Sequence, residues 1–208
     1  MEKIEFSREL VEGIAEQALK NQFQKVKEKK EIRNFIKIIF QSKVKQSLDA
    51  IDTLSESPIE KQLGYALLAG FWTFNWNSIF VPPKEKTDKE RIEIANKIGK
   101  TIDVIKEFED IMKSSEFVLF VNNWVTDKIR TDFIVGDNSN GKAIIIECDS
   151  FQWHGNKEAF VKDKKREREL VKLGFPVLRY SGSEIMRNPM ETAIEIISYL
   201  KLCQKKEC

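Results

Sequence analysis

The sequence has few of the residues from which zinc sites and disulfide scaffolds are built. Its 208 residues include a single histidine and three cysteines, and no two of the cysteines have CxxC spacing. A structural zinc ion takes four ligands, mostly Cys or His, so this composition argues against such a site. Three thiols leave one unpaired, which fits a reducing compartment better than a disulfide framework.

Long apolar runs are also missing. No run approaches the ~18 apolar residues of a membrane-spanning helix, and the opening MEKIEFSREL carries acids and no continuous apolar segment. We therefore expect no membrane span, no signal peptide and a cytoplasmic location. The composition, with 41% hydrophobic and 33% charged residues, is typical of a globular chain of one domain, or of one domain with a helical appendage.

The spacing of the apolar residues predicts helices first and then a sheet. Residues 8–48 have the pattern of one or two amphipathic helices. SPIE, residues 57–60, predicts the start of another helix, with Ser57 as N-cap and Pro58 at the first helical position. Further helices are expected at about 87–113, at 157–173 and from Asn188 onward, and strands are expected at 117–125, 128–135, 142–149 and 175–180.

These elements predict an α/β protein in two parts. Residues 1–55 are expected to form a helical N-terminal extension, and residues 56–208 to form the core. The stretch 18–48 carries nine Lys or Arg against two acids, Glu28 and Glu31. Such a surface suits a phosphate backbone, but an ordinary solvated helix face would have the same composition.

Three carboxylates stand where the two central strands end. If these strands pair as a hairpin around the polar turn between them, Asp132 lies opposite Glu147, and Asp149 points to the same face. Like charges this close destabilise one another, so a cation is expected among them. Oxygen ligands with few histidines favour Mg²⁺ or Mn²⁺. The alternative is that these acids meet solvent and pair with Arg130 or nearby lysines.

Four motifs, in this order, resemble one nuclease family. RTDFIV, IIIECDSFQWH, DKKREREL and LGFPVLRY are similar to the very-short-patch-repair-like branch of the PD-(D/E)XK nuclease superfamily. The resemblance implies a restriction-endonuclease-like fold, in which a mixed β-sheet core is flanked by helices, and it implies that the helical stretch around 84–113 is an insertion into this core. It also implies a metal-dependent endonuclease that hydrolyses DNA phosphodiester bonds.

The resemblance further implies the roles of individual residues. Asp132 and Glu147 hold Mg²⁺ or Mn²⁺, and Asp149, which stands where the superfamily usually has lysine, is a further ligand. His154 is a catalytic residue or a phosphate contact. The branch often has Gly where Ser150 stands, and FQW lengthens the step from there to His154, so the exact role of this histidine is open.

Glu60 has two possible roles. As the third residue of the helix that begins at Pro58, it can complete a capping box by accepting a hydrogen bond from the Ser57 N–H. The family's first core helix carries a Glu that approaches the metal, and Glu60 stands at a matching place, so we include it among the catalytic candidates.

The helix at 157–173 places charges on the face that should pack on the sheet. Asp163 and Arg166 are spaced to form an ion pair with each other. Alternatively, Arg166 reaches phosphate and Asp163 orients His154 or a lysine. The side chains expected to contact nucleic acid are Gln152, Trp153, Lys162, Lys165 and Arg166.

Two functional classes remain open at this level. The first is the metal-dependent endonuclease, with DNA as its substrate. The second is a catalytically inactive module of the same fold that binds DNA or takes part in assembly, because the usual lysine is missing. In either class, the N-terminal helices could bind a protein partner or mediate dimerisation.

Overall fold

The computed structural model describes residues 5–25, 30–74, 79–80, 117–126, 129–137, 141–149 and 157–205. The helix expected at 87–113, and with it the predicted insertion, lies outside the described residues. No helix in these ranges is long and apolar enough to cross a membrane.

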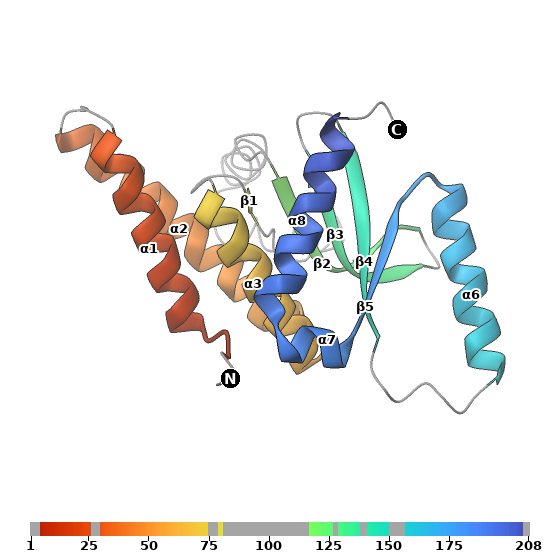
Figure 1. Cartoon of the computed structure of the whole chain (residues 1–208). Coiled ribbons are helices and arrows are strands. Elements are labelled where there is room, and N and C mark those ends of the chain that lie inside the picture. The colour runs from red at the N-terminus through yellow and green to blue at the C-terminus, as the bar shows by residue number, and fades with distance from the viewer. Residues whose placement is uncertain are drawn as a thin grey trace, which may run out of the picture.

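The described elements form a mixed sheet with helices on both faces (Figure 1). The strand order is β1-β2-β3-β4-β5, in which β3 is antiparallel to both β2 and β4, while β1 runs parallel to β2 and β5 parallel to β4. In chain order the elements are α1 (Arg8–Lys25), α2 (Lys30–Leu54), α3 (Pro58–Phe74), β1 (Ile79–Phe80), β2 (Phe117–Trp124), β3 (Arg130–Asp137), β4 (Lys142–Asp149), α6 (Lys157–Lys172), β5 (Val177–Ser181), α7 (Gly182–Arg187) and α8 (Pro189–Lys205).

The two faces of the sheet belong to two hydrophobic clusters. Helices α3 and α8 cover one face, with α1 and α2 beyond them, and α6 lies over the other (Figure 1). Side chains alternate between the faces along each strand. Phe133 and Ile146 therefore belong to the main core, whereas Ile145 packs with Leu170 of α6 in a smaller second cluster.

The central hairpin has the register expected from the sequence. Strand β4 spans the predicted residues, and Phe133 pairs with Ile146 and Val135 with Ile144. Strand β3 begins two residues later than expected, and it also ends two residues later, because its ladder continues to the Asp137–Lys142 pair beside the turn.

Helix α6 ends where the sequence indicated, at a glycine. Gly174 has a φ of 88°, a conformation that suits a residue without a Cβ. Its N–H donates to the Val171 carbonyl and the Phe175 N–H donates to the Leu170 carbonyl, so two terminal carbonyls are satisfied. The turn directs the chain into β5, which lies beside β4.

The short helix α7 was not expected from the sequence. It begins with a capping box in which Ser181 accepts from the Glu184 N–H and the Glu184 side chain accepts from the Ser181 N–H. The signal was present as SGSE at 181–184, directly after the strand.

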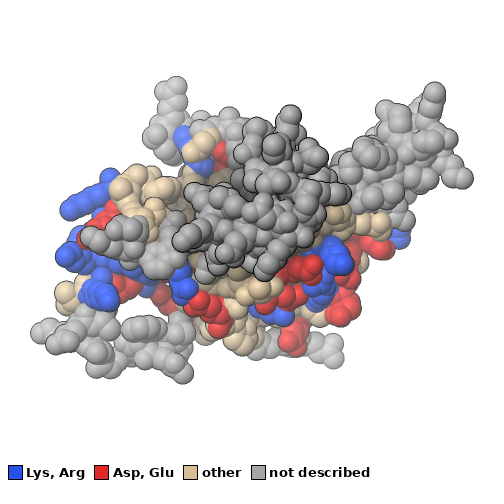
Figure 2. All heavy atoms as spheres, turned by 180° about the vertical axis from the view of Figure 1, so that it is seen from behind, with Lys and Arg blue, Asp and Glu red and all other residues tan. Residues whose placement is uncertain are grey.

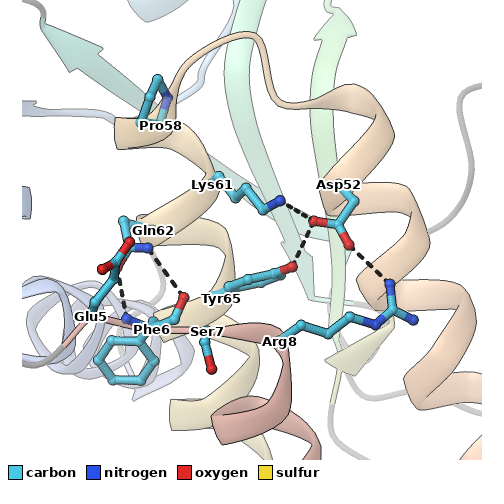
Figure 3. Close-up of a pocket in the computed structure, with 9 residues that line it drawn as sticks. All are labelled: Glu5, Phe6, Ser7, Arg8, Asp52, Pro58, Lys61, Gln62 and Tyr65. Atoms are coloured by element: carbon cyan, nitrogen blue, oxygen red, sulfur yellow. Dashed lines mark hydrogen bonds and ion pairs between the residues drawn. The ribbon is translucent and has the colours of Figure 1, made fainter.

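The N-terminal segment is attached to α3 by buried polar contacts as well as by apolar packing. The Gln62 amide accepts from the Phe6 N–H and donates to the Phe6 carbonyl, as a neighbouring strand would. Beside it is a pocket of about 400 Å³, in which Asp52 accepts hydrogen bonds from Tyr65 and Arg8 and pairs with Lys61 (Figure 3).

The neighbours of Asp52 in this pocket compensate its negative charge. Burial opposes ionisation of Asp52, but the hydrogen bonds from Lys61, Tyr65 and Arg8 outweigh it and hold its pKa below the usual value. We therefore assign the pocket a structural role, as the joint between α1, α2 and α3. Lys43 of α2 departs from the expected basic surface, because it is only 4% exposed and burial lowers its pKa to about 8.

Candidate functional site

A row of charged side chains crosses the α6 face of the sheet. Asp132 on β3, Glu147 on β4 and Arg179 on β5 each lie two residues from an apolar residue of the second cluster, so they share its face. Glu147 and Arg179 are register partners, and the β3–β4 register continued by one residue brings Asp132 to the position opposite Glu147.

The ladder between β3 and β4 stops just before this row. Its last pair is Phe133–Ile146, and two residues beyond Ile146 the Cys148 N–H donates to the Asp132 carboxylate at 2.7 Å. The Arg130 carbonyl on β3 accepts from Arg166 of α6 at 2.8 Å. Side chains of the site thus satisfy backbone groups that no longer pair with each other where the two strands separate.

Glu147 is the most buried acid of the row. Its side chain is 5% exposed, and its Oε2 accepts from Arg166 at 2.5 Å. Its Oε1 is buried and, among the described residues, has no hydrogen-bond partner. Burial and the charge of Asp132 raise the pKa of Glu147 to about 7, and the nearby Arg166 does not offset them.

Asp132 is similarly perturbed. Burial raises its pKa to about 6, and the charges of Glu60 and Asp149 add to the increase, against the hydrogen bond from the Cys148 N–H. Four carboxylates therefore act on one another here, in a combination that was expected from the sequence: Glu60, Asp132, Glu147 and Asp149.

Asp149 is held by an arginine that the sequence did not single out. Arg179 donates to both of its oxygens, Nε to Oδ2 at 3.0 Å and Nη2 to Oδ1 at 2.6 Å. The expected alternative partner, Arg130, instead pairs through both of its terminal nitrogens with Glu56, at 2.6 and 2.5 Å. Arg179 stands within the motif FPVLRY, but the sequence does not indicate Asp149 as its partner, because that contact depends on the parallel pairing of β4 with β5.

Glu60 is buried at the N-terminal end of α3. Its side chain accepts from the Ser57 hydroxyl at 2.9 Å, from the Glu56 N–H at 2.9 Å and from Asn122 at 2.7 Å. The capping interaction differs in detail from the expected one, because the Glu60 carboxylate reaches the Glu56 N–H and not the Ser57 N–H. The Ser57 hydroxyl does accept from the Glu60 N–H, as an N-cap should.

Asn122 is a second residue that sequence reasoning missed. It has a φ of 48°, an uncommon conformation for a residue with a side chain, and its amide donates to Glu60 and to the Leu54 carbonyl at 2.7 Å each. Strained backbone is often found at functional sites. The sequence signal was an Asn within the apolar strand FVLFVNNWV.

Helix α6 contributes an ion-pair chain and an exposed basic surface. Asp163 and Arg166 form the expected pair at 3.4 Å, although each has a closer partner, Arg179 at 2.7 Å and Glu147 at 2.5 Å respectively. Lys162 and Lys165 are exposed. Figure 2 shows Lys and Arg gathered, with Asp and Glu among them, on the side where α6 lies.

Several predicted site residues fall in the segment between β4 and α6. His154, Gln152 and Trp153 lie outside the described residues, and so does Ser150.

The carboxylate oxygens of this cluster suit a hard divalent cation, although the described residues do not already form a complete set of metal ligands. Within the described ranges, no group of three or more Asp, Glu, His or Cys is arranged to hold an ion. Arg166 donates to one oxygen of Glu147, and Arg179 donates to both oxygens of Asp149. The buried, unpartnered Oε1 of Glu147 beside Asp132 is nevertheless the kind of oxygen that Mg²⁺ or Mn²⁺ binds.

Comparison with known proteins finds a similarity over the part of the chain that carries this cluster. A family model described as REase_MTES_1575 matches residues 109–200, a range that contains Asp132, Glu147, Asp149 and both partner arginines. The match supports a restriction-endonuclease-like nuclease. Together with the mixed sheet between helices, it confirms the expected fold class. Searches of the curated proteins and of the solved structures find no match.

The perturbed carboxylates predict how stability depends on pH. Without divalent ions, raising the pH from about 4.5 to 7 should destabilise the fold, because folded Glu147 with its pKa of about 7 retains a proton that the unfolded chain loses near 4.5. Its contribution is about 3 kcal/mol. Asp132 acts in the same direction at slightly lower pH.

Thermal unfolding in chelator across this pH range measures the effect. Glu147→Gln should show a weaker decline than the wild type, and Glu16→Gln, which changes an exposed acid on α1, should behave as the wild type does. A Glu147→Gln profile parallel to that of the wild type would contradict the assignment.

Proposed function

We propose that the protein is a metal-dependent endonuclease that hydrolyses DNA phosphodiester bonds. Asp132 and Glu147 would hold Mg²⁺ or Mn²⁺, with Asp149 and Glu60 as further direct or water-mediated ligands. The observation that carries this proposal is the buried Glu147 carboxylate, with one oxygen lacking a partner among the described residues, beside Asp132. The family match over the same strands supports a nuclease. The order of the four motifs supports the finer assignment to the very-short-patch-repair-like branch.

The chain's own residues suit this chemistry. A divalent cation bound there would polarise the phosphoryl oxygen and make water a better nucleophile. Asp132 is kept in place by the Cys148 N–H, and Glu147 by Arg166, so both carboxylates present fixed oxygens. Lys162 and Lys165 would contact the DNA backbone.

The segment between β4 and α6 would complete the site. His154 follows Asp149 by five residues in the sequence, and an imidazole with an ordinary pKa near ~6.5 can transfer protons at neutral pH. We propose that it assists proton transfer or contacts the phosphate, and that Gln152 and Trp153 contact the nucleic acid.

A second function is favoured by one observation. Arg166 and Arg179 already neutralise Glu147 and Asp149, and an aspartate stands where the superfamily usually has lysine. A DNA-binding or assembly module without catalysis would retain this arrangement.

Incubation with labelled DNA separates the two functions. Purified protein is mixed with duplex, nicked, mismatched and branched DNA, and with single-stranded DNA and RNA, in Mg²⁺, in Mn²⁺ and in chelator. The endonuclease predicts cleavage in Mg²⁺ or Mn²⁺ and none in chelator. Binding that weakens steeply with salt, without cleavage in either metal, would instead support the inactive module.

A further inference from the structure

Arg179 occupies a central place in the site. Its side chain is 23% exposed and uses three nitrogens: Nε and Nη2 hold the two oxygens of Asp149, and Nη1 donates to Asp163 at 2.7 Å. A planar guanidinium that donates two parallel hydrogen bonds to one carboxylate fixes both the position and the rotation of that carboxylate. Arg179 therefore determines how Asp149 faces its neighbours.

The contact with Asp163 connects Arg179 to the other charged side chains of the site. Asp163 also lies 3.4 Å from Arg166, which binds Glu147 at 2.5 Å and the Arg130 carbonyl at 2.8 Å. An unbroken series of opposite charges thus links Asp149, Arg179, Asp163, Arg166 and Glu147.

The described side chains of α6, those of residues 161–172, include few buried apolar groups. Among the described side chains of this helix, only Leu170 is buried, and it lies near the far end, while Val161 is 55% and Val171 59% exposed. Arg166 and Arg179 add charged contacts between α6 and the carboxylates of the sheet.

We propose that Arg179 is a positioning residue of the nuclease, which holds Asp149 in the orientation that the metal site requires. This inference rests on the proposed function. The competing possibility is that Arg179 only neutralises the carboxylates, and in that case its removal would let a cation bind more tightly. Arg179→Lys keeps the charge, so the two possibilities predict different results for it. Cation binding should weaken if Arg179 positions Asp149, and it should stay unchanged if Arg179 only neutralises charge.

Arg179→Lys distinguishes positioning from charge. Lysine keeps the positive charge but cannot make the two parallel hydrogen bonds, so a change in metal binding would report geometry. Mn²⁺ affinity is measured on the full chain without DNA, from the electron paramagnetic resonance signal of free Mn²⁺. Cleavage of a labelled duplex then gives kcat and KM. Arg187→Lys, at an exposed arginine at the end of α7, is the matched control.

Positioning predicts that Arg179→Lys binds Mn²⁺ about 10-fold more weakly and lowers kcat by at least about 10-fold with little change in KM. The control should match the wild type in all three quantities. Mn²⁺ affinity and kcat within about two-fold of the wild type, or tighter Mn²⁺ binding, would overturn the inference.

Two further outcomes are informative. If Arg179→Lys unfolds, as circular dichroism would reveal, Asp163→Asn tests the same series of ion pairs, because it alters the other carboxylate that Arg179 binds. It should weaken Mn²⁺ binding in the same direction, and unchanged binding would overturn the inference. A wild-type protein that neither binds Mn²⁺ nor cleaves DNA would remove the proposed function and this inference together, whereas an active wild type with a neutral Arg179→Lys would remove only the inference.

Discussion

Asp132→Asn and Glu147→Gln should each reduce Mg²⁺-dependent DNA cleavage by at least about 1,000-fold, the rate equivalent of roughly 4 kcal/mol of transition-state stabilisation. Both substitutions keep the shape of the side chain and remove the negative charge that a divalent cation requires. The fold should survive, because ionising these buried carboxylates opposes folding, as their raised pKa values of about 6 and about 7 indicate. The amide introduced by Asp132→Asn would still offer an oxygen to the Cys148 N–H.

Three measurements check this prediction. Cleavage of the preferred DNA is followed in Mg²⁺ and in Mn²⁺, Mn²⁺ binding is titrated without DNA, and thermal unfolding confirms the fold. Glu16→Gln, on the exposed side of α1, serves as the charge-matched control and should cut as the wild type does. Undiminished cleavage by the Asp132→Asn, Glu147→Gln double variant would contradict the site.

Deletion of residues 1–54 should abolish cooperative folding. Among the side chains that the structure describes, the predicted extension contributes nine buried apolar residues to the main core: Phe6, Val11, Ala15, Leu19, Phe40, Val44, Leu48, Ala50 and Ile51. Burying side chains of this kind stabilises a fold by about 1.5–3 kcal/mol for each of the larger ones, so the sum is comparable with the ~5–15 kcal/mol that a domain has in total. The remaining chain would expose Trp72 and the α3 surface that these residues cover.

A pair of leucines tests the same point in the full chain. Leu48 is 0% exposed and Leu10 is 39% exposed. Leu48→Ala should lower the free energy of unfolding by about 3–5 kcal/mol, and Leu10→Ala by less than about 1 kcal/mol, as urea titration would measure. A truncated protein that is folded and cleaves DNA would instead establish residues 1–54 as a detachable interaction module.

The elements that could be predicted are those with strong local signals. Pro58 and the SPIE motif indicated the start of α3, Gly174 indicated the end of α6, and the apolar run after Lys142 indicated β4. The hairpin register followed from the short turn, and that register places Asp132 and Glu147 on one face.

The parts that could not be predicted depend on contacts between distant segments. Arg179 lies 30 residues from Asp149 in the sequence, and their pairing requires β5 to lie parallel to β4. The link from Asn122 to Glu60 spans 62 residues and depends on a left-handed backbone that a strand pattern does not indicate. The positions of His154 and of the 84–113 insertion stay predictions.

Core and charged side chains alternate along β3, β4 and β5, and this alternation limits the insertions and deletions that the protein tolerates. Adjacent positions on these three strands have different functions. Phe133, Ile146 and Tyr180 fill the main core. The residue next to each of them, Asp132, Glu147 or Arg179, belongs to the polar row. A slip of one residue in any of these strands would exchange the two sets and move charged side chains into the apolar main core. Insertions and deletions should therefore be excluded from these strands in natural relatives and in engineered variants alike, and should be confined to the loops between them.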